Sequence, residues 1–192
     1  MMNPKNLTTF VIIFLSLNVI QAQTKFEKEY RLKNTSVPAK VQAFIDSLPF
    51  QEKIKWYFEE NNTGNSIEAK FKSDKIRYSV EFDTAGNIQD IEKEIHWTDM
   101  PASTQSRITA HLNTGYGYHK IQKIQIQYSG SSDDLINFIN KKNTKNITIR
   151  YEIIVKTRLI RKVSLFEMTF DENGQHLNTA EIRFKNTDNL EY

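Results

Sequence analysis

The stretch that decides the fold is a short pattern that occurs twice along the chain. Residues 78–87 read YSVEFDTAGN, and residues 166–175 read FEMTFDENGQ. In both, apolar and polar residues alternate until an Asp that is followed three residues later by a Gly. Alternation with a period of two is typical of a half-buried β-strand, and Asp and Gly are favoured in tight turns. Each stretch therefore predicts a strand that enters a hairpin turn, with the Gly in the left-handed region.

A short amphipathic helix is predicted ahead of each pattern. The first opens Ser36-Val37-Pro38 and the second Asp99-Met100-Pro101, so each has a polar residue followed by Pro at its start. The apolar positions then recur at helical spacing. They are Val41, Phe44, Ile45 and Leu48 in the first helix, and Ile108 and Leu112 in the second, which ends at Gly115.

Segments in which apolar and polar residues alternate, between these helices and hairpin turns, predict the remaining strands. They are 53–60, 66–72 and 76–82 before a segment that begins at Ile88, and 120–128, 146–155 and 163–170 before one that begins at Leu177. The expected fold is therefore α+β, with two tandem units that each pack one helix on a four-stranded antiparallel sheet. The second unit carries an inserted helix near 131–142.

The expected boundaries follow from these elements. Residues 1–22 are a signal peptide, 23–36 an N-terminal segment, 37–98 the first unit, 99–186 the second unit and 187–192 a C-terminal tail. The charged stretch 25–34 is either a linker or an extra edge strand.

Export is predicted from the N-terminus. The apolar run from Phe10 to Ile20 follows Lys5 and ends near Ala22, the expected cleavage point. This run is too short for an ordinary membrane-spanning helix, although an uncleaved anchor is the alternative. The predicted location is periplasmic or secreted, without stable membrane insertion. Because the chain has no cysteine, its stability must come from its core.

Composition and motifs argue against several classes of function. The net charge is +3, and the signs alternate along most segments, so no nucleic-acid partner is expected. The chain lacks a Gly-x-Ser-x-Gly elbow and any Cys nucleophile, which predicts that it is not an enzyme. No cofactor and no metal site are predicted. The four histidines fall at no metal-ligating spacing, namely His96, His111, His119 and His176.

A protein-binding surface is expected on the polar face of the sheets, which the helices leave open to solvent. Exposed tyrosine and arginine side chains are common at the centres of protein interfaces. The candidate contacts on this face are Tyr57, Lys70, Arg77, Arg150 and Glu152, and the loop after the second helix adds Tyr116 and Tyr118.

Taken in order, these features resemble the PepSY-like, β-lactamase-inhibitor-like proteins, which are small exported proteins of Bacteroidetes-type bacteria. The resemblance rests on Val37-Pro38, Trp56, residues 78–86, Met100-Pro101 and residues 166–174. It implies a tandem fold that offers a concave sheet surface to a partner protein. The absence of cysteine departs from the secreted inhibitors, and no segment matches an inhibitory loop.

The leading functional prediction is a non-catalytic module that binds or inhibits another exported protein. The alternative is a binder of a small molecule or cell-envelope component between the two units. A pocket lined jointly by Trp56 and Trp97 would favour the alternative, whereas a flat charged sheet would favour a protein partner. A hydrolase would need a clustered acid and base, which the sequence does not show.

Overall fold

The computed structural model describes residues 23–183, except 63, 143–144 and 160–161. The expected signal peptide and C-terminal tail lie outside the described residues. Three helices are present, α1 (Ala39–Asp46), α2 (Ala102–Gly115) and α3 (Ser132–Ile139), with short 3₁₀ turns at Asn34–Ser36 and Trp97–Asp99. In this part of the chain, no helix is long and apolar enough to cross a membrane.

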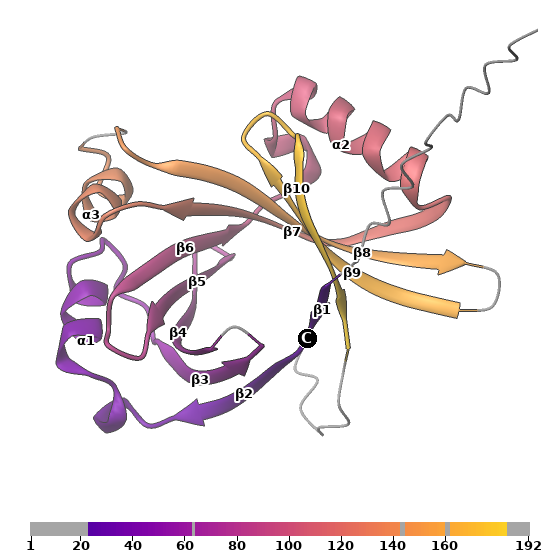
Figure 1. The fold of residues 1–192 in the computed structure, drawn as a ribbon. Coiled ribbons are helices and arrows are strands. Elements are labelled where there is room, and N and C mark those ends of the chain that lie inside the picture. The colour runs from indigo at the N-terminus through magenta and orange to yellow at the C-terminus, as the bar shows by residue number, and fades with distance from the viewer. Residues whose placement is uncertain (1–22, 63, 143–144, 160–161, 184–192) are drawn as a thin grey trace, which may run out of the picture.

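Ten strands form one sheet, in the order β1-β10-β9-β8-β7-β6-β5-β4-β3-β2 (Figure 1). The strands are β1 (Gln23–Lys25), β2 (Glu27–Leu32), β3 (Lys55–Asn61), β4 (Gly64–Ser73), β5 (Ile76–Asp83), β6 (Ile88–Glu94), β7 (Tyr118–Ser129), β8 (Thr148–Leu159), β9 (Lys162–Asp171) and β10 (His176–Ile182). Neighbouring strands are antiparallel, except that β1 runs parallel to β10.

The α+β class is as expected, but the prediction of two separate four-stranded sheets is wrong. Strands β3–β6 and β7–β10 are each antiparallel sets of four, and they join through β6 and β7 over the pairs from Ile91↔Tyr128 to Glu94↔Gln125. Because β6 and β7 pair, their backbone N–H and C=O groups form hydrogen bonds that a free strand edge would lack. The strand pattern predicted each set of four, but it carried no information about this pairing.

The two edges of the sheet are connected by the chain itself. Strand β1 pairs with β10 at one edge and β2 pairs with β3 at the other, yet only Phe26 separates β1 from β2. The sheet must therefore curl until its edges come close together. Residues 25–34, left open as a linker or an edge strand, contribute to both edges and so close the curl (Figure 1).

The helices cover the outer, apolar face of this curled sheet. One core cluster takes Val41, Phe44 and Ile45 from α1, and the other takes Ile108 and Leu112 from α2. Helix α3 confirms the inserted helix in the second half of the sequence. Its fully buried Leu135 packs into the first cluster, so α3 covers the first half of the sheet.

Both predicted hairpin turns are confirmed and take the same form. Gly86 and Gly174 have φ of +78° and +81°, which is the left-handed region. In each turn the Asp side chain accepts a hydrogen bond from the backbone four residues later, Asp83 from Asn87 at 2.8 Å and Asp171 from Gln175 at 2.7 Å. These bonds replace the ladder hydrogen bonds that end at the turn.

The second turn also packs directly on α2. A Cβ added at Gly174 would lie 2.8 Å from the backbone oxygen of Thr104, and Thr104 Oγ1 donates to the Glu172 carbonyl at 3.1 Å. Gly174→Ala would combine left-handed strain with overpacking. We expect it to lower the free energy of unfolding by about 2–4 kcal/mol, measured by urea denaturation.

Gly115→Ala is the matched control for that change. Gly115 has no neighbour within 4 Å of an added Cβ, and its φ is not positive. The control should change stability by no more than about 0.5 kcal/mol. Equal stability of the two variants would contradict the packing of this turn on α2.

Candidate functional site

The central part of the polar face is enclosed by the curl, so the expectation that the whole face lies open to solvent is wrong. Strand alternation and cross-strand register place one continuous set of polar side chains on the inner face from β2 to β10. Glu59, Ser66, Glu68, Ser79 and Gln127 on this face are all 9% exposed or less. Strand alternation predicts which residues share a face, but it does not predict curvature.

We call the central part of this face the acidic interior. It consists of Lys25, Glu29, Glu59, Ser66, Glu68, Lys70, Ser79, Glu81, Asp90, Glu92, Gln125, Gln127, Glu152 and Glu167. Carboxyl groups outnumber lysines in this set. Burying like charges together is costly unless they are paired, hydrogen-bonded or protonated.

The two lysines of the acidic interior are both ion-paired. Lys25 Nζ lies 2.8 Å from each carboxylate oxygen of Glu167, which joins β1 to β9. Lys70 Nζ lies 2.5 Å from Glu29 Oε1 and 2.9 Å from Glu68 Oε2. Burial lowers the pKa of Lys70, but the Glu68 and Glu29 carboxylates raise it by more, so that Lys70 stays charged.

Several carboxyl groups near β6 and β8 bind protons more tightly than usual. Burial raises the pKa of Asp90 and Glu152 well above the ordinary range, and repulsion from Glu92 adds to both. Burial also raises the pKa of Glu92, although Lys123 opposes this. The Gln127 side chain hydrogen-bonds to two of these carboxyl groups. Its Nε2 donates to Asp90 at 3.2 Å and to Glu152 at 3.1 Å.

The predicted contact residues do not gather on one surface. Tyr57 and Lys70 lie together on the inner face, where the Tyr57 ring has Arg31 5.1 Å and Lys70 Nζ 5.2 Å from its centroid. Glu152 belongs to the acidic interior. Arg150 is exposed on β8, and the exposed Arg77 pairs with Glu94 at 3.2 Å.

The two tyrosines after α2 differ in environment. Tyr116 is half-buried, with its ring 5.5 Å from that of Phe166 and 6.1 Å from that of His111. Tyr118 is 69% exposed. Only the second of these two side chains is available to a partner without a change in packing.

Tyr118 lies in an exposed patch that we call the arm patch, made of Tyr118, Lys120, Lys156, Arg158 and Val163. The register pairs Tyr118 with Arg158, Arg158 with Val163 and Lys120 with Lys156, so all five share one face. Val163 is 52% exposed. The β8–β9 hairpin, which carries Lys156, Arg158 and Val163, extends to one side of the sheet (Figure 1). Among the described residues, no carboxylate forms an ion pair with Lys120, Lys156 or Arg158.

Two of the four histidines come together although they are far apart in the sequence. The rings of His111 on α2 and His176 on β10 stack with their centroids 4.2 Å apart. Burial lowers the pKa of both, and mutual repulsion lowers that of His111 further. The pair is therefore neutral at pH 7 and helps to hold α2 on the sheet.

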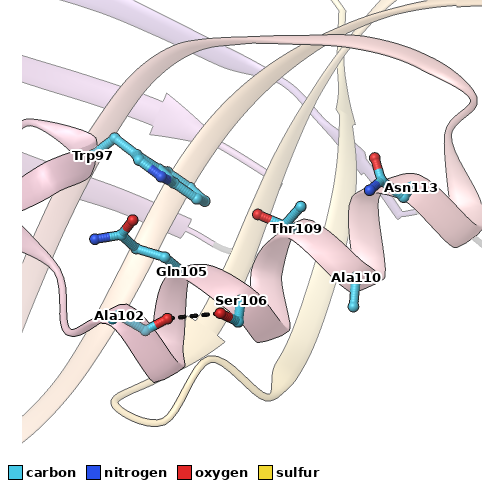
Figure 2. Close-up of a pocket in the computed structure, with 7 residues that line it drawn as sticks. All are labelled: Trp97, Ala102, Gln105, Ser106, Thr109, Ala110 and Asn113. Atoms are coloured by element: carbon cyan, nitrogen blue, oxygen red, sulfur yellow. Dashed lines mark hydrogen bonds between the residues drawn. The ribbon is translucent and has the colours of Figure 1, made fainter.

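The two tryptophans line different pockets in the described part of the chain, whereas a small-molecule site between the units was expected to be lined by both. Trp97 stands over the outer side of α2 in an open pocket of about 500 Å³ (Figure 2). The other lining residues are Ala102, Gln105, Ser106, Thr109, Ala110 and Asn113. Trp56 is buried in the first core cluster and borders a pocket of about 390 Å³ beside Gln42 and Asp46.

Sequence reasoning missed most of the arm patch and the enclosure of the acidic interior. Lys120, Lys156, Arg158 and Val163 come from three strands, and only the register shows that they are neighbours. The frequency of Glu and Asp at inward positions was a signal for the acidic interior. It could be recognised only once residues 23–32 were known to close the sheet.

Comparison with known proteins shows a likeness of fold alone. The sequence matches no family model, and no curated protein shows significant similarity to it. A DUF2874 family protein from Bacteroides uniformis has a similar structure, with a TM-score of 0.50 and 12% identity over 76% of this chain and 89% of that one. A second, from Bacteroides ovatus, has a TM-score of 0.51 and 10% identity over 75% and 86%.

A third match is described as a BLIP-like protein from Bacteroides fragilis. It has a TM-score of 0.46 and 18% identity over 82% of this chain and 96% of that one. None of the three matches is described as PepSY-like, so the PepSY part of the resemblance stays a prediction.

Proposed function

We propose that the protein is an exported, non-catalytic binding module that holds another protein through the arm patch. The observation that carries the proposal is the 69% exposure of Tyr118 opposite Arg158, with Lys120, Lys156 and Val163 on the same face. An aromatic and an Arg at the centre of a patch are the residue types that contribute most to protein interfaces. The preferred partner is a protein with an acidic surface.

The mechanism of binding is steric and electrostatic. Lys120, Lys156 and Arg158 are exposed, so they speed encounter with an acidic partner at little desolvation cost. Tyr118 has few rotatable bonds and supplies contact area at low entropic cost. The arm patch is an exposed continuation of the polar sheet face that also carries Glu152, and the enclosed part of that face helps to close the fold.

The proposal is tested by affinity capture from the exported fraction of the source organism. The baits are the wild-type protein and a Tyr118→Ala, Arg158→Ala variant. We expect one or more acidic proteins to be retained by the wild type and released as ionic strength rises. The variant should bind at least about 100-fold more weakly, because each substitution removes an interface anchor.

A Tyr30→Ala, Arg77→Ala variant is the control. It also removes one exposed tyrosine and one exposed arginine, but from β2 and β5. It should bind like the wild type. The same proteins on all three baits, or loss of binding in the control alone, would contradict the arm patch as the binding site.

A further inference from the structure

A group of three carboxylates occupies one end of the acidic interior. Glu29 on β2, Glu59 on β3 and Glu68 on β4 each place an oxygen within 4.8 Å of the other two. Glu29 and Glu59 are directly opposite in the register, and Glu68 lies two residues beyond the partner of Glu59. Like charges at such positions destabilise a sheet unless a cation lies between them.

A buried hydroxyl without a partner lies beside this group. Ser66 is directly opposite Glu59 and two residues before Glu68, so its side chain is on the same inner face. It is 2% exposed, and its Oγ has no hydrogen-bond partner among the described residues. A buried polar atom left unsatisfied costs about 1–3 kcal/mol, so this hydroxyl requires an ordered water or a bound ion as its partner.

Lys70 is a cation that already lies in this group. Its ammonium contacts Glu29 and Glu68, so a metal ion can bind here only by displacing it. Lys70 Nζ is also 5.2 Å from the centroid of the Tyr57 ring, so a small rotation of its flexible stem would keep a cation–π contact while vacating the carboxylates.

We propose that Glu29, Glu59, Glu68 and the Ser66 hydroxyl bind one calcium ion, which displaces the Lys70 ammonium toward Tyr57. Two oxygens that are each 2.3–2.6 Å from one Ca²⁺ are at most about 5.2 Å apart, and the three carboxylates meet this limit. Ca²⁺ accepts irregular sets of oxygen ligands, whereas Mg²⁺ demands a regular octahedron. Glu29 is exposed, which provides a route for entry.

Neighbouring side chains hold the ligands in position. Ser79 Oγ donates to Glu68 Oε1, and Asn61 Nδ2 donates to Glu59 Oε1 at 3.2 Å. Such bonds fix the orientation of metal-ligating carboxylates and leave their other oxygens to face the ion. The site is separate from the arm patch, so the two proposals stand or fall independently.

Calcium titration of the purified protein tests this proposal by calorimetry and thermal unfolding. We expect one ion to bind with a dissociation constant of about 1 mM or tighter and to raise Tm. Mg²⁺ should bind at least about tenfold more weakly. Glu59→Gln should weaken calcium binding by about 10–100-fold.

Glu60→Gln is the matched control. Glu60 adjoins Glu59 but lies on the opposite face of β3, where it accepts a hydrogen bond from the Tyr30 hydroxyl. It should bind calcium like the wild type. Equal binding by both variants would mean diffuse attraction to acidic residues and would overturn the site, as would absence of binding to the wild type.

Lys70→Met provides a second readout if Glu59→Gln fails to fold. Removing the competing ammonium should increase calcium affinity by about tenfold or more. Unchanged or weaker binding in this variant would overturn the proposal.

Discussion

The Glu152→Gln variant is expected to be more stable than the wild type at pH 8, by about 1–3 kcal/mol in the free energy of unfolding. Burial and repulsion from Glu92 raise the pKa of Glu152 in the folded state. The unfolded chain keeps an ordinary Glu pKa of about 4.3. Gln removes the ionisable group but keeps an oxygen that can accept the hydrogen bond from Gln127.

The sign of the pH dependence follows from proton binding. Below the ordinary pKa both states hold the proton, so Glu152 has little effect on stability. Between the ordinary and the raised pKa only the folded state holds it, and the free energy of unfolding therefore falls as pH rises through this window. The advantage of Glu152→Gln should thus be smallest near pH 4 and grow toward pH 8.

The two stacked histidines change stability with pH in the opposite direction. Because the pKa values of His111 and His176 are lowered in the folded state, their neutral pair favours folding above the ordinary pKa of about 6.5 and disfavours it as pH falls. Both histidines are present in wild type and variant, so the difference between the two urea-denaturation curves isolates Glu152. Glu52→Gln, the same substitution at an exposed residue outside the acidic interior, is the control. A Glu152→Gln difference that is flat from pH 4 to pH 8 would contradict the raised pKa.

The Lys25→Met variant is expected to lose about 2 kcal/mol of unfolding free energy at pH 8. Lys25 neutralises Glu167 through two 2.8 Å contacts and also lowers the pKa values of Asp90, Glu92 and Glu152. Its removal leaves a partly buried carboxylate unpaired, which costs more than the pair itself contributes. Because Lys25 and Glu167 are both partly exposed, the expected loss of unfolding free energy is smaller than for a fully buried ion pair.

Two further variants distinguish loss of the Lys25–Glu167 ion pair from a general loss of β1 from the sheet. Glu167→Gln combined with Lys25→Met should recover part of the loss, because the carboxylate that remained unpaired is then gone. Lys33→Met removes an exposed lysine just beyond β2 and should leave stability within about 0.5 kcal/mol of the wild type. Equal stability of Lys25→Met and Lys33→Met would show that Lys25 does not hold the sheet closed.

The sequence predicted local structure well because local structure depends on neighbouring residues. The Asp–Gly turns, both helices and the inserted helix each have a pattern within about a dozen residues, and all are found. What the sequence did not predict depends on pairing between distant strands. The joining of β6 to β7 and the parallel pairing of β1 with β10 have no signature in either strand alone.

For the candidate contact residues too, the sequence predicted the sheet face but not the exposure. Alternation correctly placed Tyr57, Lys70 and Glu152 on the polar face. Their exposure could not be derived, because it depends on the closure by residues 23–32. Tyr118 was identified from its place in a loop-like stretch. Its neighbours Arg158 and Val163 lie 40 or more positions away, and only the register brings them alongside.

An NMR titration of the side-chain carboxyl carbons tests directly whether the acidic interior is enclosed by the curled sheet. The midpoints of Asp90 and Glu152 should lie well above the ordinary values of about 4. Midpoints near 4 for both residues would show that this part of the face is open to water and would contradict its enclosure.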